Sequence, residues 1–382
     1  MVTYGFLSTF PPTRCGLATF SLALAQQLHD PAAGERCGIV HVVDRLRPKA
    51  PQDPTVQLVN GRPLSAVRAI EALNRCDVAI VQHDFDVYGG PDGDEVLAVL
   101  EAVDRPAIVV LHTVPAAPAP HRRLVLQRII DAAAAIVVLS QSDAATLTDE
   151  YHVATGRVSV IPRGAAAVTP SRHDRRAGTG QPPTILTWGL IGPGKGIEWA
   201  VAALGLMRDM DPAPRYLVCG QTHPRVAAQY GDAYRDKLHR LARENDVTDL
   251  VEFDSTYRTA GALAALVRQA DVVLLPYDAR DRATSAVLTE AVAARRPVVA
   301  TAFPHARDLL SGGAGLVVPH KDPVALSRAL RRILTEPGLA AGMQNRSGQL
   351  APMLAWPGIA AGYRGLARTV LDHVASRSAP NV

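Results

Sequence analysis

DVVLLPYDARDRATSAVLTEAVAARRPVVATAFPH, residues 271–305, is the stretch of this chain that decides its fold. Residues 271–275 form a short apolar run, as expected for a buried parallel strand, and Pro276 ends it. A polar loop follows, Thr284 and Ser285 can cap a helix, and apolar residues then recur at helical spacing. Residues 297–301 are a second apolar run. The stretch therefore predicts a strand, a helix and a strand, which is the βαβ unit of a parallel sheet.

The same alternation of short apolar runs and helical patterns extends over most of the chain. Strands are expected at 3–7, 38–43, 78–82, 107–111, 135–139 and 158–161, and again at 184–188, 216–219, 250–253, 271–275, 297–301 and 315–318. Helices in the first half are expected near 17–28, 64–75, 94–103, 121–132 and 142–150. Alternation of this kind predicts α/β domains, each built on a doubly wound parallel sheet.

Two domains are expected from the length of 382 residues and from an interruption in the pattern. Residues 165–183 read AAAVTPSRHDRRAGTGQPP, where proline, glycine and charge without apolar periodicity indicate a linker. We expect one Rossmann-like domain at 1–170 and another at 180–352, facing each other across a central cleft. A helical segment near 356–376 follows the second domain.

Composition limits the classes of function. The net charge is only +4 and no arginine-rich tail is present, so we expect no nucleic-acid partner. Arginine far outnumbers lysine, which indicates an actinobacterial source. The four cysteines form no C-x-x-C pair, which argues against a zinc site or a disulfide framework. The first residues, MVTYGFLSTFPP, lack the features of a signal peptide, and no run of about 18 apolar residues exists, so no transmembrane segment and a cytoplasmic location are expected.

The start of the helix in the 271–305 stretch is a candidate anion site. Free backbone N–H groups and the positive end of the helix dipole meet at Thr284, Ser285 and Ala286, which favours binding of a diphosphate. Glu290 lies further along the helix, where a carboxylate can accept hydrogen bonds from ribose hydroxyls. The alternative is that Glu290 is an ordinary solvated helix residue.

A glycine-rich turn opens the second half. Residues 189–196 read GLIGPGKG, so Gly189, Gly194 and Lys195 fit the G-x-x-x-x-G-K pattern of a P-loop. A P-loop requires serine or threonine next, to hold Mg²⁺, and Gly196 stands there instead. We therefore reject a P-loop ATPase.

Three segments of the first half follow expected strands, at the edge where open α/β sheets bind ligands. The first, STFPPTRCGLATF at 8–20, offers Arg14 to an anion and Gly16 for close backbone approach. The second, HDFDVYGG at 83–90, begins with His83 and Asp84. The third begins with His112, which can donate to a sugar hydroxyl or a developing charge. An ordinary proline-rich loop, an edge turn and a satisfied core histidine are the respective alternatives.

Together these motifs resemble those of retaining glycosyltransferases with the two-domain GT-B fold, specifically glycosyltransferase family four. The family signature is Glu, seven residues, Glu, a small-residue run and Pro-Val-(Val/Ile)-Ala-Thr. Glu290 matches the second Glu and residues 297–301 match the tail. Arg282 takes the place of the first Glu, and Arg295 stands where the family usually has Gly.

The resemblance implies a nucleotide-sugar donor bound by the second domain. Lys195 would neutralise the diphosphate, and Tyr257 would stack on the nucleobase. The family's arginine is replaced by Leu190, and Arg282 or Arg280 would supply the missing positive charge.

For the first domain, the resemblance implies contacts with the acceptor and with the transferred sugar. The loop of Arg14 and Gly16 would contact the donor diphosphate and the acceptor, and His83 and Asp84 would line the acceptor side. His112 would contact the transferred sugar near the reacting carbon. The helix at 356–382 would pack back on the first domain.

The expected function is retaining transfer of a hexose to a carbohydrate acceptor in polysaccharide biosynthesis. GDP-mannose is the preferred donor, as in a mannosyltransferase, and UDP-glucose is the second. No cofactor or metal is expected, because no Asp-x-Asp motif stands at a donor-side strand end. We expect a front-face mechanism, which requires no carboxylate nucleophile. The alternatives are a nucleotide-sugar epimerase and a non-catalytic sugar-nucleotide-binding module of the same fold; the latter is favoured by Arg282 and Leu190. The oligomeric state stays open.

Overall fold

The computed structural model describes residues 2–13, 15–48, 55–166, 181–256, 258–278 and 284–378. The chain divides into two compact units. Unit 1 comprises Met1–Gly164 and Trp356–Val382, and unit 2 comprises Ala165–Ala355. The sequence placed the division at a linker over 165–183; of that linker, residues 167–180 lie outside the described part of the chain.

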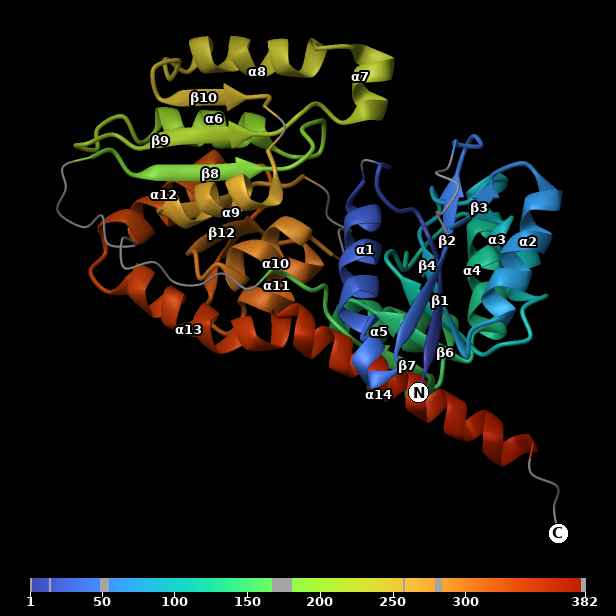
Figure 1. Ribbon diagram of the computed structural model, residues 1–382. Helices are drawn as coiled ribbons and strands as arrows, with labels where there is room; N and C mark the ends of the chain where they lie inside the picture. The colour runs from blue at the N-terminus through green and yellow to red at the C-terminus, as the bar shows by residue number, and fades with distance from the viewer. Residues whose placement is uncertain are drawn as a thin grey trace. The chain divides into compact units, whose positions relative to one another are not determined.

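Unit 1 is built on a parallel sheet with helices on both faces (Figure 1). Its strands are β1 (Thr3–Ser8), β2 (Arg36–Val43), β3 (Val56–Val59), β4 (Val78–His83), β5 (Ala107–Leu111), β6 (Ala135–Val138) and β7 (Val158–Val160). Its helices are α1 (Gly16–Leu28), α2 (Pro63–Asn74), α3 (Val96–Leu100), α4 (Pro120–Ala132), α5 (Gln141–Tyr151) and α14 (Trp356–Ser378), with the 3-10 turns η1 (Pro31–Ala33), η2 (Pro91–Gly93) and η3 (Thr155–Arg157). Within the described residues the strand order is β3-β2-β1-β4-β5-β6-β7.

Two apolar layers enclose the sheet of unit 1. Helices α2, α3, α4 and α5 pack on one face, and α1 and α14 pack on the other. Strands β4 and β5 are buried along their whole length, which accounts for their nearly continuous apolar sequence. Polar residues enter only where these strands end, at Gln82, His83 and His112, and all three are buried. These two strands therefore carry their buried polar groups at their carboxyl ends.

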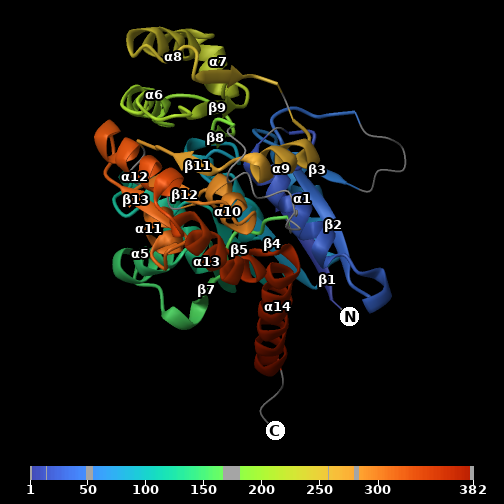
Figure 2. The same ribbon diagram turned by 90° about the vertical axis from the view of Figure 1, so that its left-hand side faces the viewer.

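Unit 2 repeats the architecture with a parallel sheet of its own (Figure 2). Its strands are β8 (Thr184–Trp188), β9 (Arg215–Cys219), β10 (Val251–Asp254), β11 (Val272–Leu275), β12 (Val298–Thr301) and β13 (Gly315–Val318), in the order β10-β9-β8-β11-β12-β13. Its helices are α6 (Ile197–Gly205), α7 (Pro224–Tyr230), α8 (Ala233–Glu244), α9 (Ala260–Gln269), α10 (Ala286–Ala293), α11 (Pro304–Leu310), α12 (Pro323–Thr335) and α13 (Leu339–Leu354). Helices α6, α8 and α12 cover one face, and α9, α10 and α11 cover the other.

The prediction of two doubly wound α/β domains is confirmed by these parallel sheets. The βαβ unit of the 271–305 stretch is present as β11, α10 and β12, with β11 and β12 paired in parallel. Strand β3 was not predicted, because its four residues, VQLV, carry too weak a pattern to be distinguished from a loop. Pairing of β3 with β2, with Val59 opposite Val43, creates the strand.

The last helix, α14, belongs to unit 1 and packs on α1, although all of unit 2 and much of unit 1 separate the two helices in sequence (Figure 1). Ile359, Ala360 and Tyr363 are buried in the same apolar layer as Phe20 and Leu24 of α1. The resemblance had implied such a return of the chain. Among the described residues, no helix combines the length and apolar composition needed to cross a membrane. Cys15, Cys37, Cys76 and Cys219 are free thiols.

Candidate functional site

In unit 2, the glycine-rich turn after β8 is fastened to the end of β11. The Asp278 N–H donates to the Gly194 carbonyl at 3.0 Å. Gly196 has a φ of +64°, and a Cβ at this position would lie 1.7 Å from the Pro276 carbonyl oxygen. Only glycine fits both the left-handed backbone and the close approach. The turn therefore holds Lys195 beside the loop that leads into α10.

Tyr277 connects Lys195 to the start of α10. The Lys195 ammonium lies 4.6 Å from the centroid of the Tyr277 ring, and its Nζ donates to the Tyr277 hydroxyl at 3.4 Å. The same hydroxyl lies 3.4 Å from Ser285 Oγ. Phe303 stacks on the Tyr277 ring at 5.2 Å between centroids. Tyr277 is 1% exposed, so it is a fixed support that places a cation next to the helix N-terminus.

Ser285 is the N-cap of α10, as its position in the sequence predicted. Its Oγ accepts from the Leu288 N–H at 3.3 Å, and its own N–H donates to His305 Nδ1 at 2.9 Å. The Ser285 N–H is therefore occupied, whereas the next N–H groups, those of Ala286 and Val287, have no partner within the helix by geometry. These two amides and the helix dipole are what the site offers an anion. Thr284 precedes them and is half-buried.

Gly189 and Glu290 complete the same corner of unit 2. A Cβ on Gly189 would lie 3.6 Å from Val287 Cγ2 and 3.8 Å from Lys195 Nζ, so the turn, the lysine and the first turn of α10 are neighbours. Glu290 is half-buried, and the Trp188 indole Nε1–H donates to its Oε2 at 3.2 Å. The carboxylate is therefore held by a buried indole of β8, which the sequence analysis did not foresee.

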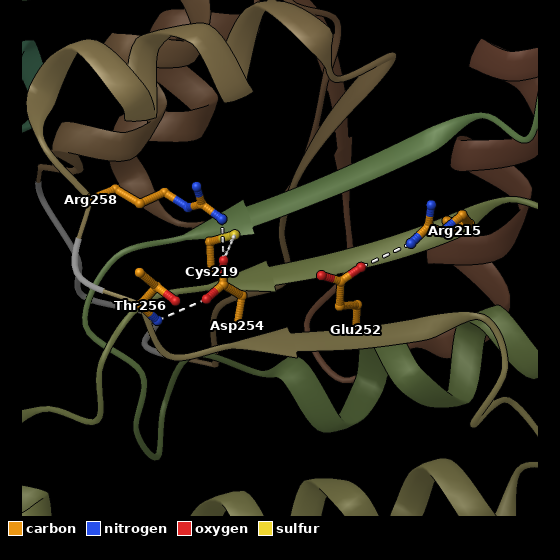
Figure 3. A network of polar contacts seen from close by, with 6 residues as sticks. All are labelled: Arg215, Cys219, Glu252, Asp254, Thr256 and Arg258. Carbon is orange, nitrogen blue, oxygen red and sulfur yellow. Dashed lines mark hydrogen bonds and ion pairs between the residues drawn. The ribbon is translucent and has the colours of Figure 1, made fainter.

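A second polar network lies at the ends of β9 and β10 (Figure 3). Asp254 accepts the Thr256 N–H at 2.8 Å and pairs with Arg258, and the Cys219 thiol points to the same carboxylate. Hydrogen bonds from Thr256 and Arg258 lower the pKa of Asp254 to about 2, whereas burial raises the pKa of Cys219 to about 11. The network ties the Thr256 main chain and the Arg258 side chain to the end of β10. Tyr257 itself, predicted to stack on a base, lies outside the described residues.

In unit 1, the turn between β1 and α1 is fixed by its cap. Cys15 is the N-cap of α1, and its Sγ accepts from the Ala18 N–H at 3.3 Å. Gly16 is the first residue of the helix, its carbonyl accepts from Arg163 Nη2 at 3.0 Å, and a Cβ there would meet nothing within 4 Å. The space beside Gly16 is thus open within unit 1. Arg14, Arg280 and Arg282, all predicted cations, lie outside the described residues.

His83 and Asp84, predicted to line the acceptor side, are both largely enclosed. His83 is fully buried between Phe85 and Tyr88, and within the described residues neither ring nitrogen has a hydrogen-bond partner. Burial lowers the pKa of His83 to about 4. Asp84 accepts from the Phe85 N–H at 2.8 Å, and burial raises its pKa above the ordinary value. His83 is therefore a neutral core ring, and Asp84 is the more accessible of the two.

His112 is held at the end of β5 by two hydrogen bonds. Its backbone N–H donates to the His83 carbonyl at 3.0 Å, and its ring Nε2 lies 2.7 Å from Gln82 Oε1. The Phe20 ring packs edge-on against the imidazole at 5.1 Å. Burial, with smaller contributions from the charges of Arg163 and His83, lowers the pKa of His112 to about 3. At neutral pH the ring is therefore uncharged.

The structure brings Gly189, Lys195, Ser285 and Ala286 together in unit 2, with Glu290 on the same helix; His83, Asp84 and His112 lie at neighbouring strand ends of unit 1. Sequence reasoning missed the residues that support them: Trp188, Tyr277, Gln82 and Arg163. A usable signal existed for the first three, because each stands at or just beyond the carboxyl end of an apolar run. Within the described residues, no group of three or more His, Cys, Asp or Glu side chains has the arrangement of a metal site.

Comparison with known families matches both halves of the chain. The family model described as "Glycosyltransferase Family 4" matches residues 16–166, and the one described as "Glycosyl transferases group 1" matches residues 182–336. The chain has the two-domain architecture of the GT-B glycosyltransferases. The first matched range covers most of unit 1 and extends two residues past Gly164, and the second falls within unit 2.

Curated relatives and solved structures agree with this GT-B assignment. The D-inositol 3-phosphate glycosyltransferase of Kineococcus radiotolerans is 30% identical over 285 residues, which cover 69% of this chain and 64% of that protein. The enzyme of the same name from Salinispora arenicola is 28% identical, covering 63% of this chain and 56% of that protein. The chain thus spans less than two thirds of the length of these relatives.

The solved structures resemble this GT-B chain in fold alone. Sucrose-phosphate synthase from Thermosynechococcus elongatus has a TM-score of 0.74 at 20% identity, covering 98% of this chain and 100% of that one. Anabaena HepE, solved in complex with UDP and glucose, has a TM-score of 0.72 at 15% identity, covering 97% and 99%.

Proposed function

We propose that this chain transfers a hexose from a nucleoside-diphosphate sugar to a carbohydrate acceptor, with retention of the anomeric configuration. The observation that carries the proposal is the corner of unit 2 at which Lys195, Gly189 and the N-terminus of α10 meet. This corner combines a fixed cation, free helix amides and a glycine that lets a ligand approach the backbone. Such a combination suits a diphosphate.

The donor's diphosphate lies at the N–H groups of Ala286 and Val287 in this proposal, and Lys195 neutralises part of its charge. Glu290 accepts hydrogen bonds from the ribose hydroxyls in this proposal, while Trp188 holds one of its carboxylate oxygens. The leaving nucleoside diphosphate gains negative charge as the glycosidic bond breaks, so a fixed cation stabilises the transition state more than the ground state. Because Lys195 and the helix dipole supply this positive charge, we propose that transfer is independent of metal.

The transfer itself follows a front-face course. The bond between the anomeric carbon and the phosphate oxygen breaks, and its electron pair leaves with the diphosphate. A hydroxyl of the acceptor attacks the same face of the sugar, and its proton passes to the departing phosphate oxygen. This course uses no carboxylate nucleophile. Asp84 and the loop at Gly16 in unit 1 are assigned to the acceptor, and His112 is assigned to the transferred sugar.

GDP-mannose is the first donor that we propose and UDP-glucose the second. The names of the curated relatives add a phosphorylated cyclitol, D-inositol 3-phosphate, to the acceptors worth testing. A thermal-shift screen of nucleoside diphosphates identifies the base, and incubation of the sugar nucleotides with and without acceptors then identifies the reaction. Turnover of UDP-N-acetylglucosamine without an acceptor would instead indicate an epimerase.

The decisive variant is Lys195→Gln, which removes the cation and keeps most of the side-chain length. We expect nucleoside diphosphate affinity to fall about 10- to 100-fold, because a hydrogen bond to a charged group contributes about 1.5–3 kcal/mol. Lys237→Gln is the matched control: Lys237 is 47% exposed and pairs with Glu198 at 3.2 Å. Its loss should leave the affinity unchanged, as should EDTA. Equal affinities of wild type and Lys195→Gln, or no stabilisation by any nucleoside diphosphate, would refute the proposal.

A further inference from the structure

The proposed reaction gives no role to the side chain of Gln82. This side chain nevertheless contacts the imidazole of His112, which we assign to the transferred sugar. It is fully buried near the end of β4, on the same face of the sheet as His112 at the end of β5. Its Oε1 meets His112 Nε2 at 2.7 Å, whereas its Nε2 has no partner within the described residues. Nearby on this face, Ser8 and Ser21 satisfy each other at 2.6 Å. Within the described residues, the Gln82 side-chain amide therefore makes its hydrogen bond to His112 alone.

The chemistry of the amide decides the state of the ring. An amide oxygen can only accept a hydrogen bond, so His112 Nε2 must carry the proton that it donates to Gln82. In a neutral imidazole the other nitrogen, Nδ1, then holds a lone pair. The contact with Gln82 Oε1 and the edge of Phe20 hold the ring, so this lone pair has one direction.

We propose that Gln82 is a positioning residue that fixes His112 in its Nε2–H tautomer and leaves Nδ1 to accept a hydrogen bond from a hydroxyl of the transferred sugar. The histidine is then an acceptor that orients the sugar, and it supplies neither a proton nor a positive charge. This inference rests on the proposed function for the substrate, while the tautomer itself belongs to the free protein.

Two substitutions separate this role from simple packing. Gln82→Met keeps a similar volume and removes the acceptor, which leaves the buried Nε2–H of His112 without a partner. We expect kcat to fall about tenfold or more, with the donor KM changing by less than about threefold, because a misdirected ring mainly affects the reacting geometry. Gln82→Glu restores an acceptor at the same place and should recover most of the loss in kcat near neutral pH.

The pH dependence of kcat distinguishes the proposed role of Gln82 from packing, because a change in packing alone would not shift it. The carboxylate in Gln82→Glu favours the charged form of His112, whereas the charges of Arg163 and His83, the groups whose fields reach the ring, oppose it. A protonated ring has no lone pair at Nδ1. The acid limb of kcat in Gln82→Glu should therefore move to higher pH than in wild type.

Imidazole ¹⁵N spectra of histidine-labelled protein test the tautomer without any substrate, with the His112 signals assigned by their loss in His112→Asn. We expect wild type and Gln82→Glu to show a protonated Nε2 and an unprotonated Nδ1, and Gln82→Met to show a mixture. Gln57→Met is the control, because the Gln57 amide is half-buried and, within the described residues, hydrogen-bonds to the main chain of Arg47 alone, at 2.8 Å. This variant should keep the wild-type kcat.

An Nδ1–H tautomer in wild type, or full activity of Gln82→Met, would overturn the inference. If no donor is turned over at all, the proposed function fails, but the spectra still decide whether Gln82 sets the tautomer.

Discussion

His83 and His112 stand at the ends of neighbouring strands, and burial leaves both rings uncharged at neutral pH. Their surroundings differ: Gln82 accepts a hydrogen bond from His112, whereas His83 lies between two aromatic rings. A buried neutral histidine resists protonation in the folded protein and accepts a proton freely in the unfolded chain. The pair therefore couples the stability of unit 1 to pH.

The sign and the pH window follow from the pKa of His83, which is about 4 in the folded protein against 6.5 ordinarily. Between these values the unfolded state binds more protons, so stability is complete above pH 6.5 and is lost as the pH falls. Replacing His83 by Phe, which suits its aromatic surroundings, should reduce this loss by about 1.4 kcal/mol per pH unit. Denaturant unfolding at several pH values between 7.5 and 5 measures it.

His373→Gln serves as the control, because His373 is exposed on α14. Its pH dependence of unfolding should match that of wild type. Parallel curves for wild type and His83→Phe would show that His83 does not resist protonation.

At the scale of elements, the glycine-rich turn between β8 and α6 shows how the conformation of a loop places one lysine. Gly194 and Gly196 both have positive φ, +85° and +64°. Gly194 faces open space, whereas Gly196 lies against the end of β11. The turn therefore requires Gly196 for its close contact with the strand as well as for its backbone conformation.

A pair of alanine substitutions separates these two requirements. Gly194→Ala should cost about 1 kcal/mol, because only the left-handed conformation is penalised. Gly196→Ala adds a collision with the Pro276 carbonyl, since its Cβ would be 1.7 Å from that oxygen, and should cost about 3 kcal/mol or more. Denaturation midpoints of the two variants and wild type provide the measurement. Equal costs at both positions would mean that the turn is not fastened to β11 in this way.

At the scale of the whole molecule, the chain ends in the unit in which it began. Helix α14 buries Tyr363 completely against the layer formed by α1 and the first sheet. The Tyr363 hydroxyl has no hydrogen-bond partner within the described residues. Tyr363 therefore stabilises unit 1 through the burial of its aromatic ring.

Tyr363→Ala should destabilise unit 1 by about 3–5 kcal/mol, because it leaves a large cavity in the core. Tyr363→Phe should be neutral or slightly stabilising, because it removes only an unpaired buried hydroxyl. Hydrogen exchange followed by mass spectrometry locates the effect: exchange in β1 and α1 should accelerate in Tyr363→Ala, whereas β8 and α6 of unit 2 should be unchanged. Loss of stability in Tyr363→Phe would imply a partner for the hydroxyl.

The sequence by itself determined the two α/β domains, the βαβ unit at 271–305 and the placement of Ser285 at a helix start. These features are encoded by periodic apolar patterns and by capping residues, which act between neighbours in the chain. It also pointed to Lys195 and His112, because parallel strands bring their carboxyl ends to one edge.

Only the tertiary structure decided what holds these residues. Tyr277 lies 82 residues from Lys195 in sequence, Trp188 lies 102 from Glu290, and Gln82 lies 30 from His112. The same is true of strand β3, which exists because β2 pairs with it. Contacts across such separations depend on strand order and register, and no local pattern records them, because a side chain's partner is fixed only when the sheet has formed.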